Sequence, residues 1–209
     1  MPKTRRKVSA VFNDFSTQLR KARKIDDENQ RQISTGNIGL QQAHIITEAL
    51  FFKIFRDYEN FIRDVFILYA QGKPTADGTN VSSYLKPKNF HHTEQLLTSS
   101  LQYLDWNSPD NIIERADIYL AHGSPIRFVY TSKKSILNEY KLIRNHYAHN
   151  STSSLKGYLK VIRRHFGANP IVIPSIGEYF LLISKRNPQK YYLLEFFDDL
   201  EYCADQIKK

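Results

Sequence analysis

The sequence contains a single cysteine, Cys203, so no disulfide bond can form within the chain. It also contains no apolar run of the length that crosses a bilayer. The basic start, Met1 to Lys7, is followed by residues too polar to form the apolar core of a secretion signal. We therefore expect a cytoplasmic protein, in a reducing compartment, with no membrane contact.

Disordered and fibrous proteins are excluded by a hydrophobic content of 41% and an aromatic content of 13%. Acidic residues are scarce in two segments. Residues 1–35 carry nine Lys or Arg against four Asp or Glu, and residues 151–190 carry seven against one. Such segments attract polyanions, of which nucleic acid is the expected one, although solvated helix faces give the same pattern.

Apolar residues recur mainly at the spacing of α-helices, which predicts an all-α bundle. Residues 1–35 are expected to form a basic N-terminal helical extension, and residues 36–209 the helical domain. Residues 73–89 are rich in Pro, Gly, Ser, Thr and Asn and predict an irregular connection. Residues 171–183 hold a proline and a glycine among β-branched residues, which predicts a short β-hairpin or a connector. The predicted helices cover about residues 8–24, 38–71, 90–103, 109–121, 132–149, 155–166 and 189–208.

The predicted helix 132–149 ends in a group of residues that is sufficient to cleave RNA without a metal. Arg144 can neutralise charge on a phosphorane, and His149 carries an imidazole, a group whose ordinary pKa near neutrality suits proton transfer. Asn145 lies four residues before His149, so its amide can contact and orient the imidazole. His146 lies inside the same group and is a candidate contact for RNA or for a dimer partner.

Arg144 and His149 do not converge on a regular helix, because five residues correspond to about 140° around the axis. Either the helix loosens at its end, or two copies of the helix face each other and share one site. Lys141 belongs to the same polar stripe as Asn145 and His149. The stripe expected to be buried consists of Ile136, Tyr140, Ile143 and Tyr147.

In these residues the chain resembles the HEPN superfamily of α-helical ribonucleases and toxins. The signature of that superfamily is Arg, a polar residue, then His after four to six intervening positions near a helix end, and Arg144, Asn145 and His149 match it. The serine- and threonine-rich run after His149 and the basic helix that follows look like the RiboL-PSP-like branch. Glu59 and Arg63 fit the acidic residue and the basic residue four positions later that the family often carries in an earlier long helix.

The resemblance implies a homodimeric, metal-independent endoribonuclease that cuts RNA by 2′-hydroxyl attack and leaves 2′,3′-cyclic phosphate ends. His149 would be the general acid or base, Arg144 would stabilise the phosphorane, and Asn145 would orient His149 or hold the substrate. Glu59, Arg63 and His146 would support the site. Many members act as toxins or in phage defence, so an antitoxin or a defence-system protein is an expected partner. The alternative is a non-catalytic HEPN module that binds RNA or nucleotide, or that dimerises within a defence complex.

Arg144 and His149 also suit a surface helix end, where cations favourably meet the helix dipole. Lys141, Arg163 and Arg164 are the predicted RNA contacts, and simple solvation is their alternative. No recognition-helix pattern supports a DNA-binding regulator.

Two further patterns lead to no predicted site. His91 and His92 lack Cys, Asp or Glu at ligand spacing, so we expect neither a metal site nor a cofactor. The run Gly72 to Thr75 imitates the end of a phosphate-binding loop, but Ile67 occupies the position of the required upstream glycine. Because no strand precedes the run either, nucleotide hydrolysis is excluded.

Overall fold

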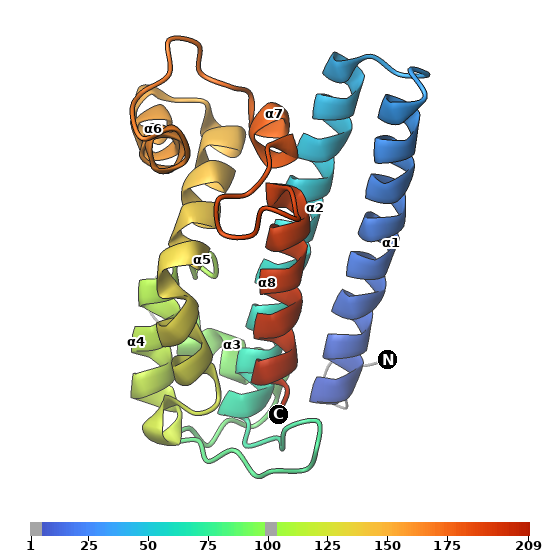
Figure 1. Cartoon of the computed structure of the whole chain (residues 1–209). Helices are drawn as coiled ribbons and strands as arrows, with labels where there is room; N and C mark the ends of the chain where they lie inside the picture. The colour runs from blue at the N-terminus through green and yellow to red at the C-terminus, as the bar shows by residue number, and fades with distance from the viewer. Residues whose placement is uncertain (1–5, 99–103) are drawn as a thin grey trace. The chain divides into compact units, whose positions relative to one another are not determined.

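The computed structural model describes residues 6–98 and 104–209, and in these ranges it contains eight α-helices (Figure 1). Pairing of extended backbone is confined, within the same ranges, to two isolated bridges, Ser83 with Leu120 and Ile183 with Tyr191. The predicted all-α class is confirmed. The helices are α1 (Val8–Ser34), α2 (Leu40–Ala70), α3 (Phe90–Thr98), α4 (Pro109–Tyr119), α5 (Ile126–His149), α6 (Thr152–Phe166), α7 (Ile176–Leu181) and α8 (Tyr192–Ile207).

The chain divides into two compact units that interleave along the sequence. The first unit consists of Met1–Thr17, Asp57–Leu137 and Glu201–Lys209, and the second of Gln18–Arg56 and Asn138–Leu200. Helices α1, α2, α5 and α8 each contribute residues to both units. The predicted boundary near residue 35, between an N-terminal extension and a helical domain, does not correspond to these two units and stays a prediction.

The core of the first unit is built around the second half of α2. From Phe61 to Ala70 this helix is buried at almost every position, which is the property expected of a central helix. The ring of Phe15 in α1 lies 5.4 Å from that of Phe61. The hydroxyl of Tyr69 donates a 2.6 Å hydrogen bond to the carbonyl oxygen of Ile207 in α8, so its buried polar atom is satisfied.

The core of the second unit is a cluster of aromatic rings from four helices. Phe51 of α2 lies 4.5 Å from Phe180 of α7 and 4.9 Å from Phe196 of α8, measured between ring centroids. Tyr140 of α5 meets Phe196 edge to face at 4.9 Å. All four side chains are almost fully buried, and this cluster anchors the half of α5 that carries the Arg-Asn-x-x-x-His motif.

Helix α1 extends ten residues beyond its predicted end at Lys24, to Ser34. The reason is a buried stripe that continues through polar residues, since Asp26 and Asn29 follow Ala22 at helical spacing and are all but inaccessible to solvent. The amide of Asn29 donates to the carbonyl of Ala43 and to the hydroxyl of Thr47, both at 3.3 Å. Hydropathy alone does not reveal such a stripe, because Asp26 and Asn29 are polar and are held in the interior by hydrogen bonds, that of Asp26 coming from the hydroxyl of Tyr191.

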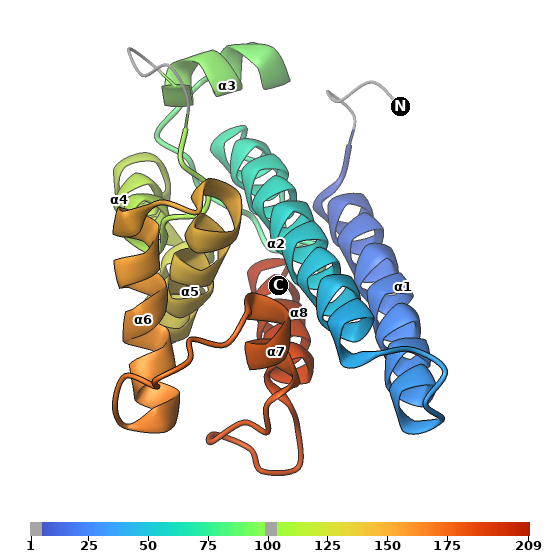
Figure 2. The same cartoon turned by 90° about the horizontal axis from the view of Figure 1, so that it is seen from above.

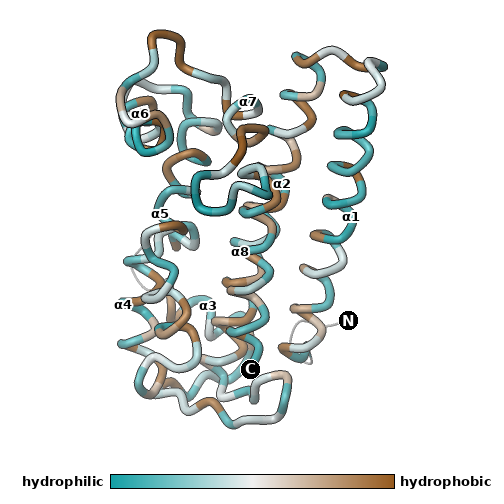
Figure 3. Tube along the Cα trace, viewed as in Figure 1, coloured by the Kyte–Doolittle hydropathy of each residue, from teal (hydrophilic) through white to brown (hydrophobic). Residues whose placement is uncertain are grey.

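The β-hairpin predicted near residues 171–183 is wrong, because residues 176–181 form the short helix α7. Ser175 caps this helix, its side chain accepting a 3.1 Å hydrogen bond from the backbone N–H of Glu178. The residues before it form an apolar connector, which is the brown segment between α6 and α7 in Figure 3. The side chains of Ile171, Val172 and Ile173 in this connector are exposed. The helix predicted over residues 90–103 is present as α3, and its last five residues lie outside the described ranges.

No helix within residues 6–98 and 104–209 combines the length and the apolar character needed to cross a membrane. The predicted starts and stops of several helices are confirmed. Ser108 is the N-cap residue of α4 with Pro109 at its first position, and Gly72 follows the end of α2 in a left-handed conformation, with φ +73°.

Gly177 allows α7 to pack directly against the backbone of α2. A Cβ atom at this position would lie 2.2 Å from the carbonyl oxygen of His44, and a backbone atom cannot move away as a side chain can. We expect Gly177→Ala to lower the free energy of unfolding by about 1–3 kcal/mol, the usual cost of overpacking. Urea denaturation would measure the loss. Gly39→Ala is the matched control, since nothing lies within 4 Å of its added Cβ, and an equal loss in both variants would contradict the packing described.

Candidate functional site

The predicted motif lies where α5 ends and α6 begins, in the second unit (Figure 2). Only Asn150 and Ser151 separate the two helices. Asn150 has a left-handed backbone, with φ +40°, and its N–H donates a 2.9 Å hydrogen bond to the carbonyl of His146. Asn adopts this conformation more readily than other non-glycine residues, so the chain can reverse direction directly after His149.

The start of α6 is held by a reciprocal pair of hydrogen bonds. The Ser151 hydroxyl accepts from the N–H of Ser154 at 3.2 Å, and the Ser154 hydroxyl accepts from the N–H of Ser151 at 2.9 Å. This arrangement is a capping box with serine in the place that Glu or Gln usually occupies. The sequence interpretation missed it and began the helix near Leu155, although the spacing of Ser151 and Ser154 is the signal that identifies such a cap.

Between the two helices lies a surface pocket of about 270 Å³. Asn145 and His149 line its α5 side, four residues apart on the helix, as the predicted polar stripe requires. His149 is exposed and Asn145 is half-buried. The complete lining consists of Leu142, Asn145, His149, Ser151, Ser153, Ser154 and Gly157. An amide, an imidazole and the start of a fifteen-residue helix therefore surround one small polar space, which suits an anion such as a phosphate group.

Arg144 lies beside this pocket without lining it. Its guanidinium carbon is 6.0 Å from the centre of the Phe52 ring, and its Nη1 is 3.5 Å from the Oδ1 of Asn145. Helix α5 stays regular through His149, so the helix end does not loosen in the way that would bring Arg144 to the imidazole. Convergence of the two side chains through a second copy of the chain stays a prediction.

His146 is part of the packing between α5 and α6. Its ring stacks on that of Tyr158 at 5.0 Å, and its Nδ1 lies 3.4 Å from the Ser154 hydroxyl. Burial lowers the pKa of the His146 imidazole, because the charged form loses solvation there. Tyr147, predicted to be buried, is 39% exposed, and its ring is tilted against that of Phe52 with the centroids 4.7 Å apart. The buried stripe of α5 therefore ends at Ile143.

The predicted supporting residues Glu59 and Arg63 belong to the first unit, on α2. Arg63 donates hydrogen bonds from Nε and Nη2 to the Oδ1 of Asp64, at 3.0 and 2.9 Å. Desolvation raises the pKa of the buried Tyr130 hydroxyl, and the charges of Cys203 and Glu59 raise it further. Glu59 itself is half-buried. Both residues thus have identified neighbours in their own unit, and their predicted role at the motif stays a prediction.

The predicted RNA contacts lie on α5 and α6. Lys141 is half-buried on α5. Arg163 and Arg164 are exposed in the last turn of α6, where positive charge is favourable. Arg163 donates to the Oδ1 of Asn169 at 3.1 Å, and Arg164 forms an ion pair with Glu139. In the parts of the chain that the structure describes, no group of three or more His, Cys, Asp or Glu is placed to hold a metal ion.

The lowered pKa of His146 predicts a pH dependence of stability. The unfolded chain takes up a proton here near pH 6.5, whereas the folded chain does so only at lower pH, so stability at this site is fully present above about 6.5 and declines below it. His146→Gln should therefore lose less unfolding free energy than the wild type between about pH 7.5 and 5.5. A titration of the His146 ring protons by NMR provides the direct check. A midpoint at or above 6.5 would contradict the environment described.

Comparison of the chain with known protein families, with curated proteins and with solved structures gives no significant match.

Proposed function

We propose that this chain is a metal-independent endoribonuclease with a HEPN-like helical bundle. The observation that carries the proposal is the pocket between α5 and α6, in which Asn145 and His149 stand next to the start of α6. The pocket combines a group that can move a proton with a positive helix end that can receive a phosphate. These are the two functions that RNA cleavage without a metal requires at one place.

In the proposed reaction the 2′-oxygen of one nucleotide attacks the adjacent phosphorus. As a general base, the neutral imidazole of His149 removes the 2′-hydroxyl proton. As a general acid, its imidazolium form instead donates a proton to the departing 5′-oxygen. A new bond forms between the 2′-oxygen and phosphorus while the bond from phosphorus to the 5′-oxygen breaks. The products are a 2′,3′-cyclic phosphate and a 5′-hydroxyl end. Arg144 supplies positive charge to the phosphorane, and Asn145 holds the imidazole or the substrate in place.

A homodimer completes the proposed site. Arg144 lies on a different side of a regular α5 from His149 and outside the pocket that His149 lines. Two copies of α5 facing each other would bring the guanidinium of one protomer to the imidazole of the other. The arrangement of a twofold dimer then creates two equivalent sites.

The remaining predicted residues take supporting roles in this proposal. Lys141, Arg163 and Arg164 would contact RNA phosphates outside the scissile position, since cations of α5 and α6 can position a polyanion without selecting its sequence. Glu59, Arg63 and His146 would support the site. The proposed biological role is that of a toxin or a phage-defence effector in the cytoplasm, with an antitoxin or a defence-system protein as partner.

Replacement of the proposed proton-transfer group should abolish most cleavage. We expect His149→Ala to lower kcat by at least about 100-fold, the lower range for loss of a general acid or base, and Arg144→Ala to have an effect of similar size. Cleavage of total cellular RNA by the purified chain would be followed by gel, and the ends identified by their resistance to ligation before removal of the cyclic phosphate. Activity should persist in EDTA.

The matched control is His91→Ala, which removes an exposed histidine of α3 in the first unit. It should cut as the wild type does. Equal activity in His149→Ala and the wild type, or complete loss of wild-type activity in EDTA, would refute the proposal.

Mixing two inactive variants tests whether each site is shared between protomers. If Arg144 and His149 act across the dimer, Arg144→Ala and His149→Ala chains that exchange protomers form heterodimers with one intact site. Random exchange should restore about a quarter of the wild-type activity, because about half of the dimers are mixed and each has one of two sites. No recovery, in dimers shown by mass measurement to have exchanged, would place each site within one chain.

A second candidate function is a non-catalytic HEPN module that binds RNA or nucleotide, or that joins a defence complex. The contact of Arg144 with the Phe52 ring favours it, because a guanidinium held there stabilises the fold without touching a ligand in the pocket. The two functions differ in one measurement. RNA binding that is unchanged in the Arg144→Ala, His149→Ala double variant, without cleavage by the wild type, would identify the module.

A further inference from the structure

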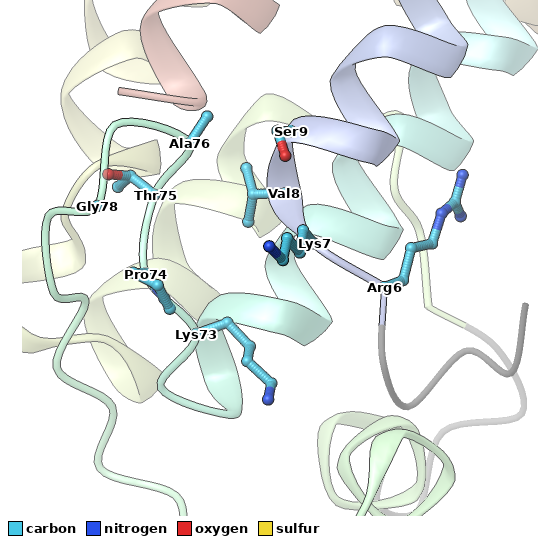
Figure 4. Close-up of a pocket in the computed structure, with 9 residues that line it drawn as sticks. All are labelled: Arg6, Lys7, Val8, Ser9, Lys73, Pro74, Thr75, Ala76 and Gly78. Atoms are coloured by element: carbon cyan, nitrogen blue, oxygen red, sulfur yellow. The ribbon is translucent and has the colours of Figure 1, made fainter.

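The first unit contains a larger pocket, of about 560 Å³, between the start of α1 and the connection that follows α2 (Figure 4). Its volume falls in the range of small-molecule binding sites. Three cationic side chains belong to its wall, and no acidic or aromatic side chain of the described residues does. The lining residues are Arg6, Lys7, Val8, Ser9, Lys73, Pro74, Thr75, Ala76 and Gly78.

Arg6 has a structural role at the edge of this pocket. Its guanidinium forms ion pairs with Asp14 of α1 and with Asp64 of α2, which is largely buried. In Figure 4 its side chain points away from Lys73 and Thr75. The charge of Arg6 is therefore already balanced, and it holds the start of α1 next to α2.

Lys7 and Lys73 differ from Arg6, because both are exposed and neither forms an ion pair with a described carboxylate. Residues 1–5 and 99–103 contain no Asp or Glu, so no acidic partner is available to them there. Two ammonium groups that belong to different segments of the chain thus border one pocket. Their charges are uncompensated within the protein, which favours an anionic ligand.

Backbone groups add to this positive environment. Val8 and Ser9 are the first residues of α1, a helix of 27 residues with no acidic residue in its first turn. The N–H groups of Ala10 and Val11 donate to the carbonyl of Lys7 at 3.1 and 3.2 Å, so within the first turn it is those of Val8 and Ser9 that have no acceptor inside the helix. The helix dipole makes this end positive. The nearest carboxylate in the connection, Asp77, accepts hydrogen bonds from the Thr75 hydroxyl and, at 3.2 Å, from the N–H of Thr79. It is engaged within its own turn.

We propose that this pocket binds a polyphosphate chain, such as the triphosphate of a nucleotide, through Lys7, Lys73 and the start of α1. The volume exceeds what a single phosphate needs, and the lack of an aromatic side chain in the wall means that a base has no surface on which to stack. Recognition is therefore of the phosphates and not of the base. Lys73 belongs to the run that imitates a phosphate-binding loop, and here it serves binding alone, with no bond cleaved.

Calorimetric titration of the full chain with inorganic triphosphate tests the proposal. We expect the Lys7→Gln, Lys73→Gln double variant to bind about tenfold or more weakly, since each lost exposed charge contact weakens binding several-fold. The matched control is Lys86→Gln with Lys88→Gln, which removes the same charge from exposed positions of the same connection outside the pocket. The control should bind within about twofold of the wild type. Equal weakening in both double variants, or no binding by the wild type, would overturn the proposal.

A measurement on the unaltered chain guards against variants that fail to fold. Triphosphate should protect Lys7 and Lys73 from acetylation and leave Lys86 and Lys88 reactive, as mass spectrometry of the digested protein would show. Uniform protection of all four lysines would overturn the site. The Arg144→Ala, His149→Ala double variant should bind triphosphate as the wild type does. Failure of the triphosphate site can therefore be distinguished from failure of the proposed nuclease activity.

The source of the phosphates is distinguished by competition. ATP and an RNA with a 5′-triphosphate should both displace inorganic triphosphate if the chain end alone is recognised. Displacement by ATP but not by the RNA would identify a free nucleotide as the ligand, and the reverse would identify an RNA end. Displacement by a 5′-hydroxyl RNA as effective as that by the 5′-triphosphate RNA would overturn recognition of a polyphosphate.

Discussion

The close approach of α6 to α5 at Gly157 is the constraint on which the candidate pocket depends. A Cβ atom at Gly157 would lie 2.9 Å from the Cδ2 of Leu142, so a larger residue must push the helices apart or displace that side chain. Because only Asn150 and Ser151 join the helices, any such separation would change the direction in which α6 leaves the turn. The space in front of His149 would change with it.

Aromatic contacts hold this helix pair in place. The ring of Tyr158 stacks with His146 on one side, and its hydroxyl lies 3.1 Å from the carbonyl oxygens of Pro174 and Ser175. Burial raises the pKa of this hydroxyl, so it remains a protonated donor. A single tyrosine therefore connects the end of α5, the body of α6 and the start of α7. The residues of the candidate site belong to helices that pack against one another, which favours a fixed geometry of their side chains.

Sequence patterns predicted the helical class and most helix positions, because apolar periodicity and residues such as Pro109 and Gly72 act locally. They did not predict the length of α1, whose buried stripe contains Asp26 and hence depends on partners distant in sequence. They also misassigned α7, since Gly177 is required by contact with another helix and not by a turn. At the site, spacing placed Asn145 and His149 together correctly. The guanidinium of Arg144 lies 6.0 Å from the centre of the Phe52 ring on α2, a contact that no local pattern encodes.

The capping box of α6 has a consequence for the thermodynamics of ligand binding. Ser151 and Ser154 satisfy each other's backbone N–H groups in the absence of any ligand. The wall of the pocket is thus already ordered, and its conformational entropy was lost when the chain folded rather than when a ligand arrives. An anion entering the pocket meets a preorganised surface, so electrostatics and desolvation, not the ordering of this turn, would set its affinity. Weakening the cap would make binding entropically more costly even where every group that touches the ligand is retained.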